Sequence, residues 1–132
     1  RKALHIPDTA PAWDMCSTTL GYNLQTEASS WIYEVLNGKI KMMFYSGDTD
    51  GAVPTYGSKQ WIKKLNRPVL EAWRPWTTKG EVSGYVEKYQ GLDFVTVRGV
   101  GHMAPQWAPK AMQNFVSKFM SNQPLADPSP ID

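Results

Sequence analysis

The sequence predicts an α/β fold, in which a mostly parallel sheet is flanked by helices and extended by a β-hairpin. Segments rich in β-branched and aromatic residues alternate with segments whose apolar residues recur at helical spacing. The first strand-like segment, residues 39–46, ends in a continuous apolar run, which is typical of a strand buried on both faces of a parallel sheet. Two strand-like segments lead into glycine-rich loops with chemically active side chains, and strand ends are where this fold class places ligand chemistry.

Length, composition and charge limit the kinds of protein that this chain can be. Its 132 residues are 42% hydrophobic and 12% aromatic, which suits a globular protein of one-domain size. The 14 basic and 12 acidic residues are interspersed, so no basic stripe favours a nucleic-acid partner. No apolar run approaches the ~20 residues of a membrane span, so we expect no membrane partner. The single cysteine, Cys16, excludes a metal site built from clustered cysteines, and no cofactor is expected.

The first third of the chain predicts a loop-rich start and one helix. Residues 1–7 favour a short helical turn at most, because Pro7 disfavours helical backbone in the residue before it. A helix is predicted over residues 27–36, with Thr26 as its N-cap and its apolar side chains on one face. The dipeptide Asn37-Gly38 then provides a typical helix stop.

A strand, an acidic loop and a second helix follow. Residues 39–46 are the predicted strand, and residues 47–54 (Gly-Asp-Thr-Asp-Gly-Ala-Val-Pro) are the loop. Residues 55–65 have the spacing of a helix whose apolar side is formed by Trp61, Ile62 and Leu65. The acidic loop therefore lies between a strand end and a helix start.

A hairpin and another strand are predicted next. Residues 69–76 and 84–89 are both extended in character and can pair across the polar turn at 77–80. Pro75 restricts this hairpin to an edge or an end position, because proline lacks the N–H that a ladder requires. Residues 92–97 (Leu-Asp-Phe-Val-Thr-Val) predict a further strand.

The strand at 92–97 leads into a loop with one histidine, His102. Glycines on its N-terminal side allow backbone conformations that present the ring at the strand end. A helix is predicted to begin near Pro109, since proline suits a first helical position, and its apolar residues recur at helical spacing: Met112, Phe115, Val116, Phe119 and Met120. The proline-rich stretch from residue 122 to the end is expected to fray.

Asp50 and His102 form the candidate catalytic pair. A carboxylate that accepts a hydrogen bond from one imidazole nitrogen fixes the tautomer and leaves the other nitrogen free to deprotonate a nucleophile. The alternatives are a surface histidine and acidic residues that only satisfy their own turn. The other histidine, His5, has no carboxylate at a recognisable spacing, and we expect it to serve packing or to lie on the surface.

Four groups of residues carry a resemblance to a known family. They are Arg-Lys-Ala-Leu-His-Ile-Pro with Trp-Asp-Met-Cys in residues 1–16, Tyr-Ser-Gly-Asp-Thr-Asp with Val-Pro in 45–54, Arg-Pro-Trp at 74–76, and Gly-Val-Gly-His-Met-Ala-Pro at 99–105. In this order they resemble the C-terminal third of the serine carboxypeptidases, which include the cathepsin A-like enzymes. The resemblance implies that residues 1–125 are the C-terminal portion of an α/β-hydrolase fold, and residues 126–132 are expected to form a flexible tail.

The resemblance also assigns roles to four residues. It implies that Asp50, the second acid of the Gly-Asp-x-Asp loop, is the triad aspartate and that His102 is the triad histidine. Met103 matches a family position that lines the pocket for the last residue of the substrate. Cys16 matches a cysteine that forms a disulfide to the N-terminal part of the enzyme in relatives.

The chain itself has no recognisable nucleophile. α/β-Hydrolases place their serine in a Gly-x-Ser-x-Gly turn that precedes the aspartate and the histidine. Three serines, Ser46, Ser58 and Ser83, adjoin a glycine, but none has the second glycine at the required distance. We therefore expect the serine in an upstream large chain of the same enzyme, disulfide-linked through Cys16, and expect the isolated chain to be inactive.

The function implied is that of a serine carboxypeptidase, which removes C-terminal residues from a peptide substrate by acyl-enzyme chemistry. Its expected location is lysosomal, vacuolar or secreted. Serine carboxypeptidase-like acyltransferases and hydroxynitrile lyases share the same triad frame and are alternatives. A non-catalytic module that uses its six tryptophans and six tyrosines to bind a carbohydrate or a protein is an alternative of another class.

Overall fold

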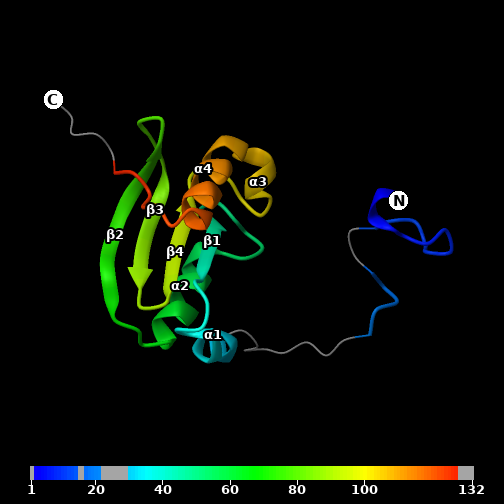
Figure 1. The fold of residues 1–132 in the computed structure, drawn as a ribbon, viewed down its shortest axis with the longest axis horizontal. Coiled ribbons are helices and arrows are strands. Elements are labelled where there is room, and N and C mark those ends of the chain that lie inside the picture. Colours follow the sequence, from blue (N-terminus) through cyan, green and yellow to red (C-terminus); the bar gives the residue numbers. More distant parts are fainter. Residues whose placement is uncertain (1, 15–16, 22–29, 128–132) are drawn as a thin grey trace.

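A four-stranded sheet forms the centre of the fold, with helices on both faces (Figure 1). The computed structural model describes residues 2–14, 17–21 and 30–127. Within them the sheet has the order β1-β4-β3-β2, with strands β1 (Met43–Gly47), β2 (Val69–Thr78), β3 (Glu81–Tyr89) and β4 (Leu92–Val97). The predicted hairpin and both predicted strands around it are therefore present, and the α/β class is confirmed.

The direction of the strands differs from the expected one. Strands β1 and β4 are parallel, whereas β4 pairs antiparallel with β3, and β3 pairs antiparallel with β2. The expectation of a mostly parallel sheet is thus not confirmed for the described residues, where the sheet is mixed. The reason is local: β2, β3 and β4 are joined by tight turns, and only the connection from β1 to β2, which contains α2, is long enough for a crossover.

Helices were predicted well where apolar spacing is strong. The structure has η1 (Lys2–Leu4), α1 (Ser30–Leu36), α2 (Thr55–Lys64), α3 (Ala104–Trp107) and α4 (Pro109–Met120). Helix α4 begins at the predicted proline, while residues 27–29 and the predicted N-cap Thr26 lie outside the described residues. Helix α3 was not predicted. Its single turn is compatible with Pro105, because the fixed φ of proline suits the first turn of a helix.

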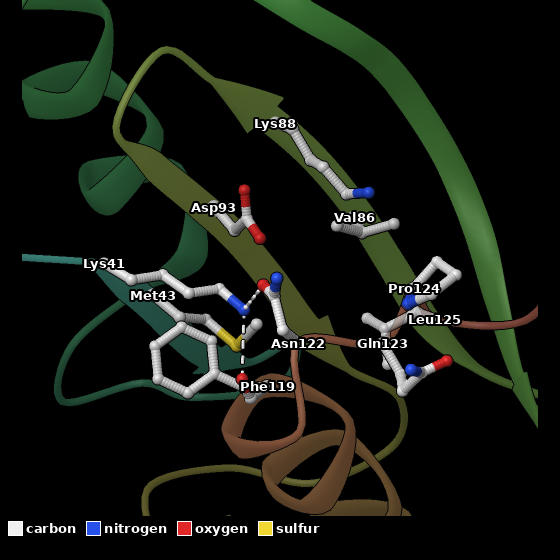
Figure 2. Close-up of a pocket in the computed structure, with 10 residues that line it drawn as sticks. All are labelled: Lys41, Met43, Val86, Lys88, Asp93, Phe119, Asn122, Gln123, Pro124 and Leu125. Carbon is white, nitrogen blue, oxygen red and sulfur yellow. Dashed lines mark hydrogen bonds between the residues drawn. The ribbon is translucent and has the colours of Figure 1, made fainter.

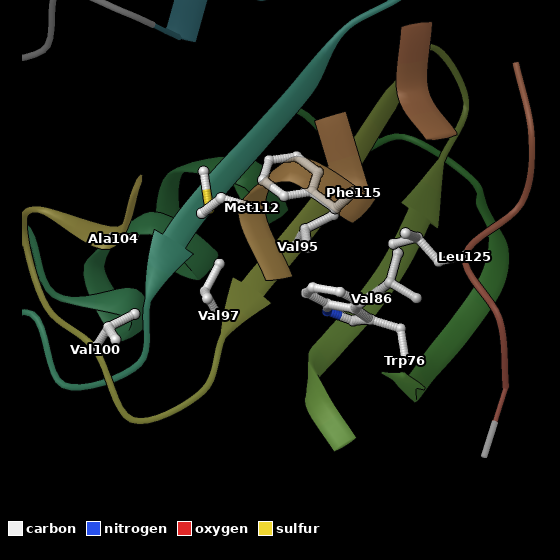
Figure 3. Close-up of a cluster of buried hydrophobic side chains, with 9 residues drawn as sticks. All are labelled: Trp76, Val86, Val95, Val97, Val100, Ala104, Met112, Phe115 and Leu125. Atoms are coloured by element: carbon white, nitrogen blue, oxygen red, sulfur yellow. The ribbon is translucent and has the colours of Figure 1, made fainter. Parts of the chain in front are cut away.

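Two apolar clusters, one on each face, hold the helices against the sheet. On the face of α4, nine buried residues pack together (Figure 3): Trp76, Val86, Val95, Val97, Val100, Ala104, Met112, Phe115 and Leu125. On the face of α2, Phe94 and Leu92 pack with Ile62 and its neighbours. Strand β4 supplies residues to both clusters because successive side chains of a strand point to opposite faces.

Strand β1 departs from the expectation of burial on both faces. It begins at Met43 instead of residue 39, and the side chain of Tyr45 is 41% exposed. Among the described residues β1 has one strand neighbour, β4, so its other edge carries no ladder. The continuous apolar run is therefore found on a strand at the edge of the sheet that the described residues form.

The segment after α4 is ordered against the sheet. Leu125 is buried, the N–H of Thr77 donates to the carbonyl oxygen of Ala126 at 3.0 Å, and Arg74 pairs with Asp127 at 2.7 Å. The prediction that the chain frays from residue 122 is therefore wrong for residues 122–127. The tail predicted over 126–132 lies mostly outside the described residues. None of the helices in the described part of the chain has the length and apolarity to cross a membrane.

Candidate active site

The acidic loop and the histidine loop begin side by side. Strands β1 and β4 are parallel neighbours, with Gly47 of β1 opposite Val97 of β4. Both loops therefore leave the sheet at the carboxyl ends of neighbouring parallel strands, which is where α/β sheets place their ligand sites. Asp50 follows the end of β1 by three residues, and His102 follows the end of β4 by five.

Asp50 and His102 lie within hydrogen-bond distance of each other. The Nδ1 atom of His102 is 3.1 Å from Oδ2 of Asp50. An ionised carboxylate can only accept, so Nδ1–H is the donor, and a neutral ring then has its lone pair on Nε2. The side chain of Asp50 is 7% exposed, whereas that of His102 is 59% exposed. The arrangement gives a ring nitrogen that can accept a proton from solvent or from a group placed beside it.

The acidic loop holds the Asp50 carboxylate in place with its own backbone. The N–H groups of Ala52 and Val53 donate to Oδ1 at 2.8 and 3.0 Å, which leaves Oδ2 for the imidazole. The bond from Val53 is the main reason that the pKa of Asp50 lies below its usual value; burial opposes it, and Ala52 and His102 lower the pKa further. Asp50 is therefore ionised at mildly acidic and neutral pH, and in this form it can orient the histidine.

Further hydrogen bonds join the two loops. Backbone N–H groups of Asp48 and Thr49 donate to the carbonyl oxygens of Val97 and Val100 at 3.0 and 3.1 Å. In the opposite direction, the N–H of Gly99 donates to Oδ1 of Asp48 at 2.7 Å. The sequence suggested that Asp48 could merely satisfy its own turn. Its position in the Gly-Asp-x-Asp stretch was the only signal, because its partner lies 51 residues away.

Gly47 is where the two loops come closest. A Cβ atom built on Gly47 would lie 2.4 Å from the carbonyl oxygens of both Val100 and Gly101. Any side chain would push the histidine loop away from the acidic loop, so this position requires glycine for close approach.

A small cavity of about 190 Å³ lies beside the pair, bounded by β1 and both loops. Its lining residues are Phe44, Tyr45, Ser46, Gly47, Asp50, Val53 and His102. In the described part of the chain no hydroxyl group hydrogen-bonds to Nε2 of His102, and no group of three or more metal-ligating side chains occurs. The cavity thus leaves open space beside the imidazole ring of His102.

A larger cavity, about 320 Å³, lies away from this chemistry (Figure 2). It is formed where β1 and β4 begin, under the segment after α4, and Asp93, Lys41 and Lys88 face it. Lys41 is bonded to the carbonyl oxygen of Phe119 and to Asn122 at the end of α4. Burial raises the pKa of Asp93, which the two lysines partly offset.

The other two predicted site residues are not part of the pair's geometry. Met103 directly follows His102, precedes α3 and is 46% exposed, and it does not line the small cavity. Cys16 lies outside the described residues. The roles assigned to both by the resemblance remain predictions.

Comparison with known proteins identifies the family to which this chain is similar. The family model described as serine carboxypeptidase matches residues 1–122. Serine carboxypeptidase-like 40 of Arabidopsis thaliana is 38% identical over 120 residues, which are 89% of this chain and 24% of the relative. Serine carboxypeptidase-like 29 of the same plant is 37% identical over 131 residues, which are 96% of this chain and 27% of the relative.

The chain spans about a quarter of the length of the curated relatives that it matches. Those relatives are serine carboxypeptidase-like proteins by name. The match covers both strands that carry the Asp50 and His102 loops, and it includes the hairpin between them. The chain belongs to the serine carboxypeptidase family.

Proposed function

We propose that this chain supplies the aspartate and the histidine of a Ser-His-Asp triad in a serine carboxypeptidase, which removes C-terminal residues from peptides. The observation that carries the proposal is the 3.1 Å contact between His102 Nδ1 and Asp50 Oδ2, with the other carboxylate oxygen held by two backbone N–H groups. In this arrangement the aspartate orients the ring and stabilises its protonated form, and Nε2 serves as the base.

The reaction would proceed by acyl transfer. Nε2 of His102 takes the hydroxyl proton of a serine from the upstream part of the enzyme as its oxygen attacks the last peptide carbonyl carbon. The imidazolium then protonates the leaving amine, the C–N bond breaks, and an acyl-enzyme remains. Water, deprotonated by the same ring, hydrolyses the ester and releases the shortened peptide. The proposal puts such a serine in the small cavity beside His102, which is lined by β1 and the two loops.

Three further parts of the proposal concern residues and partners beyond the pair. Met103 would contact the last residue of the substrate, because it directly follows His102 and exposes much of its side chain. Cys16 would link this chain to a larger chain that carries the serine. A lysosomal, vacuolar or secreted location would allow that disulfide to persist.

The decisive experiment measures turnover by the intact natural protein. Release of the last amino acid from an N-blocked dipeptide is expected, together with covalent labelling of a serine by an organophosphonate. His102→Gln should lower turnover by several orders of magnitude. Transfer of an acyl group from an activated ester to an alcohol, or cleavage of a cyanohydrin, in place of peptide hydrolysis would instead assign the acyltransferase or lyase alternative. Oligosaccharide binding that survives His102→Gln and Asp50→Asn, without any turnover, would assign a binding module.

Intact mass under non-reducing and reducing conditions tests the partner. Release of this chain from a larger one on reduction is the expected result, and it would locate the disulfide at Cys16. A free thiol at Cys16 with no associated chain would contradict the two-chain arrangement.

A further inference from the structure

We infer that Asp48 is a positioning residue for the Asp50–His102 pair, because its carboxylate fastens the histidine loop to the acidic loop. The inference rests on the proposed function and adds a residue to it. Asp48 precedes Asp50 by two residues, and its partner Gly99 precedes His102 by three. A displacement of Asp48 therefore shifts Asp50, and a displacement of Gly99 shifts His102.

The hydrogen bonds of Asp48 differ from those of an ordinary turn residue. Asp50 Oδ1 accepts bonds from Ala52 and Val53 in its own loop, whereas Asp48 Oδ1 accepts the N–H of Gly99 in the other loop at 2.7 Å. Among the described residues, the Asp48–Gly99 and Asp50–His102 contacts are the two side-chain hydrogen bonds that join these loops.

The donor of this hydrogen bond, the N–H of Gly99, lies in a turn that other contacts also hold. Gly99 has a φ of 71°, a conformation that favours glycine, and the N–H of Arg98 beside it donates to the carbonyl oxygen of Ser83 on β3 at 2.8 Å. The turn before His102 therefore donates one hydrogen bond to β3 and another to the Asp48 carboxylate. Without the Asp48 side chain, the turn would keep its hydrogen bond to β3 and the backbone bonds from Asp48 and Thr49, but it would lose the side-chain contact to the acidic loop.

Kinetics of the intact enzyme with a matched set of variants test this role. Asp48→Ala removes the acceptor, Asp48→Asn keeps an oxygen that can accept the Gly99 N–H, and Thr49→Ala changes the residue between the two acids, whose side chain makes no hydrogen bond among the described residues. Misplaced catalytic groups lower the rate without loss of binding, so Asp48→Ala should lower kcat about 10- to 100-fold at nearly constant KM. Asp48→Asn and Thr49→Ala should stay within about threefold of the unsubstituted enzyme.

A double-mutant cycle asks whether Asp48 acts through the pair. If it does, Asp48→Ala should cost less than about twofold in an Asp50→Asn background, because the orientation it protects is already lost. Full additivity of the two losses would overturn the inference. So would equal kcat values for Asp48→Ala and Thr49→Ala, or failure of Asp48→Asn to restore kcat.

Hydrogen exchange separates failure of this inference from failure of the proposed function. Asp48→Ala should accelerate amide exchange in both loops, including Thr49 and the segment around His102, whereas Asp48→Asn and Thr49→Ala should not. This readout needs no turnover, so it decides the role of Asp48 even if the intact protein hydrolyses no peptide. Faster exchange confined to the Gly99 amide would show a local turn bond and overturn the inference.

Discussion

Two carboxylates in this chain, Asp50 in the loop after β1 and Glu71 in β2, have pKa values below the usual range, but different groups lower them. For Asp50 the backbone N–H of Val53 contributes most, with Ala52 and His102 adding to it and burial opposing it. These donors belong to the loop itself. They hold one oxygen of Asp50 and leave the other for the imidazole of His102.

Glu71 owes its lowered pKa to long cationic side chains. Burial alone raises the pKa, but the hydrogen bonds and charges of Lys88 and Arg74 outweigh it. Lys88 lies opposite Glu71 in the ladder between β2 and β3. One carboxylate oxygen of Glu71 pairs with Arg74 and the other pairs with Lys88. Such a cluster ties two strands together, and it leaves no free base.

The contrast teaches how one residue type serves two purposes. The two N–H groups that hold Asp50 belong to the backbone, which the loop already orders, so no partner side chain loses conformational entropy in orienting Asp50. The hydrogen bond from His102 uses Nδ1 and leaves Nε2 available. The Glu71 cluster uses flexible, partly exposed side chains whose pairing contributes little to stability. We therefore expect Asp50 to take part in catalysis and Glu71 to contribute modestly to stability.

The sharpest test of this contrast replaces one member of each pair in the intact enzyme. Asp50→Asn or His102→Gln should lower kcat about 10⁴-fold, since the ring loses its orientation or the base is lost. The double variant should be hardly worse than either single one, because the pair acts as a unit. Glu71→Gln is the matched control, and steady-state hydrolysis of a blocked dipeptide is the measurement. Comparable loss in Glu71→Gln would erase the distinction between the two carboxylates.

Gly47→Ala tests whether the close approach of the loops is required. The added methyl group would overlap the carbonyl oxygens of Val100 and Gly101, so the loops must separate. We expect a loss of stability of about 1–3 kcal/mol, as for other overpacked sites, and a lower kcat. Gly51→Ala, whose added atom meets nothing within 4 Å, is the control. Denaturant unfolding and kcat should change together in Gly47→Ala alone; unchanged values there would contradict the geometry.

Asp93 provides a smaller test at the opposite end of the sheet. Burial raises its pKa, so the folded state penalises the charged form, and stability falls as pH rises from the unfolded pKa of about 3.9 through the folded value. Asp93→Asn should therefore raise Tm by a few degrees at pH 7, with a gain below about 1 kcal/mol because the site is partly solvated. The gain should shrink at acidic pH. A lower Tm at pH 7 would mean that Lys41 and Lys88 stabilise the carboxylate more than burial opposes it.

The smallest effect is expected for Glu71→Gln on stability. Its folded pKa is lowered, so its contribution is present above the unfolded pKa of about 4.3 and is lost as pH falls through the folded value. At pH 7 the substitution should cost less than about 1 kcal/mol, and the difference should vanish in acid and decrease in high salt. Thermal unfolding as a function of pH and salt measures it, and a cost independent of both would indicate packing in place of charge.

Local patterns allowed much of the fold to be predicted. Apolar periodicity predicted α2 and α4, β-branched and aromatic content predicted β4, and two extended segments across a polar turn predicted the hairpin. The segment after α4 was mispredicted because its composition is that of a tail, whereas its order comes from Arg74 and Thr77 on β2, about fifty residues away. The direction of β3 relative to β4 was also outside the reach of periodicity, which states where a strand lies and not how it pairs.

The residue types of the candidate pair were determined by the sequence alone: the second acid of a Gly-Asp-x-Asp loop and a histidine after a Gly-x-Gly turn, each following a strand. The tertiary structure decided that β1 and β4 are parallel neighbours, that Oδ2 of Asp50 meets Nδ1 of His102, and that Asp48 reaches Gly99. Turn preferences and apolar periodicity depend on residues close together in the sequence, so they can be recognised from the sequence alone. Contacts across fifty residues depend on the strand order and the packing of the whole sheet.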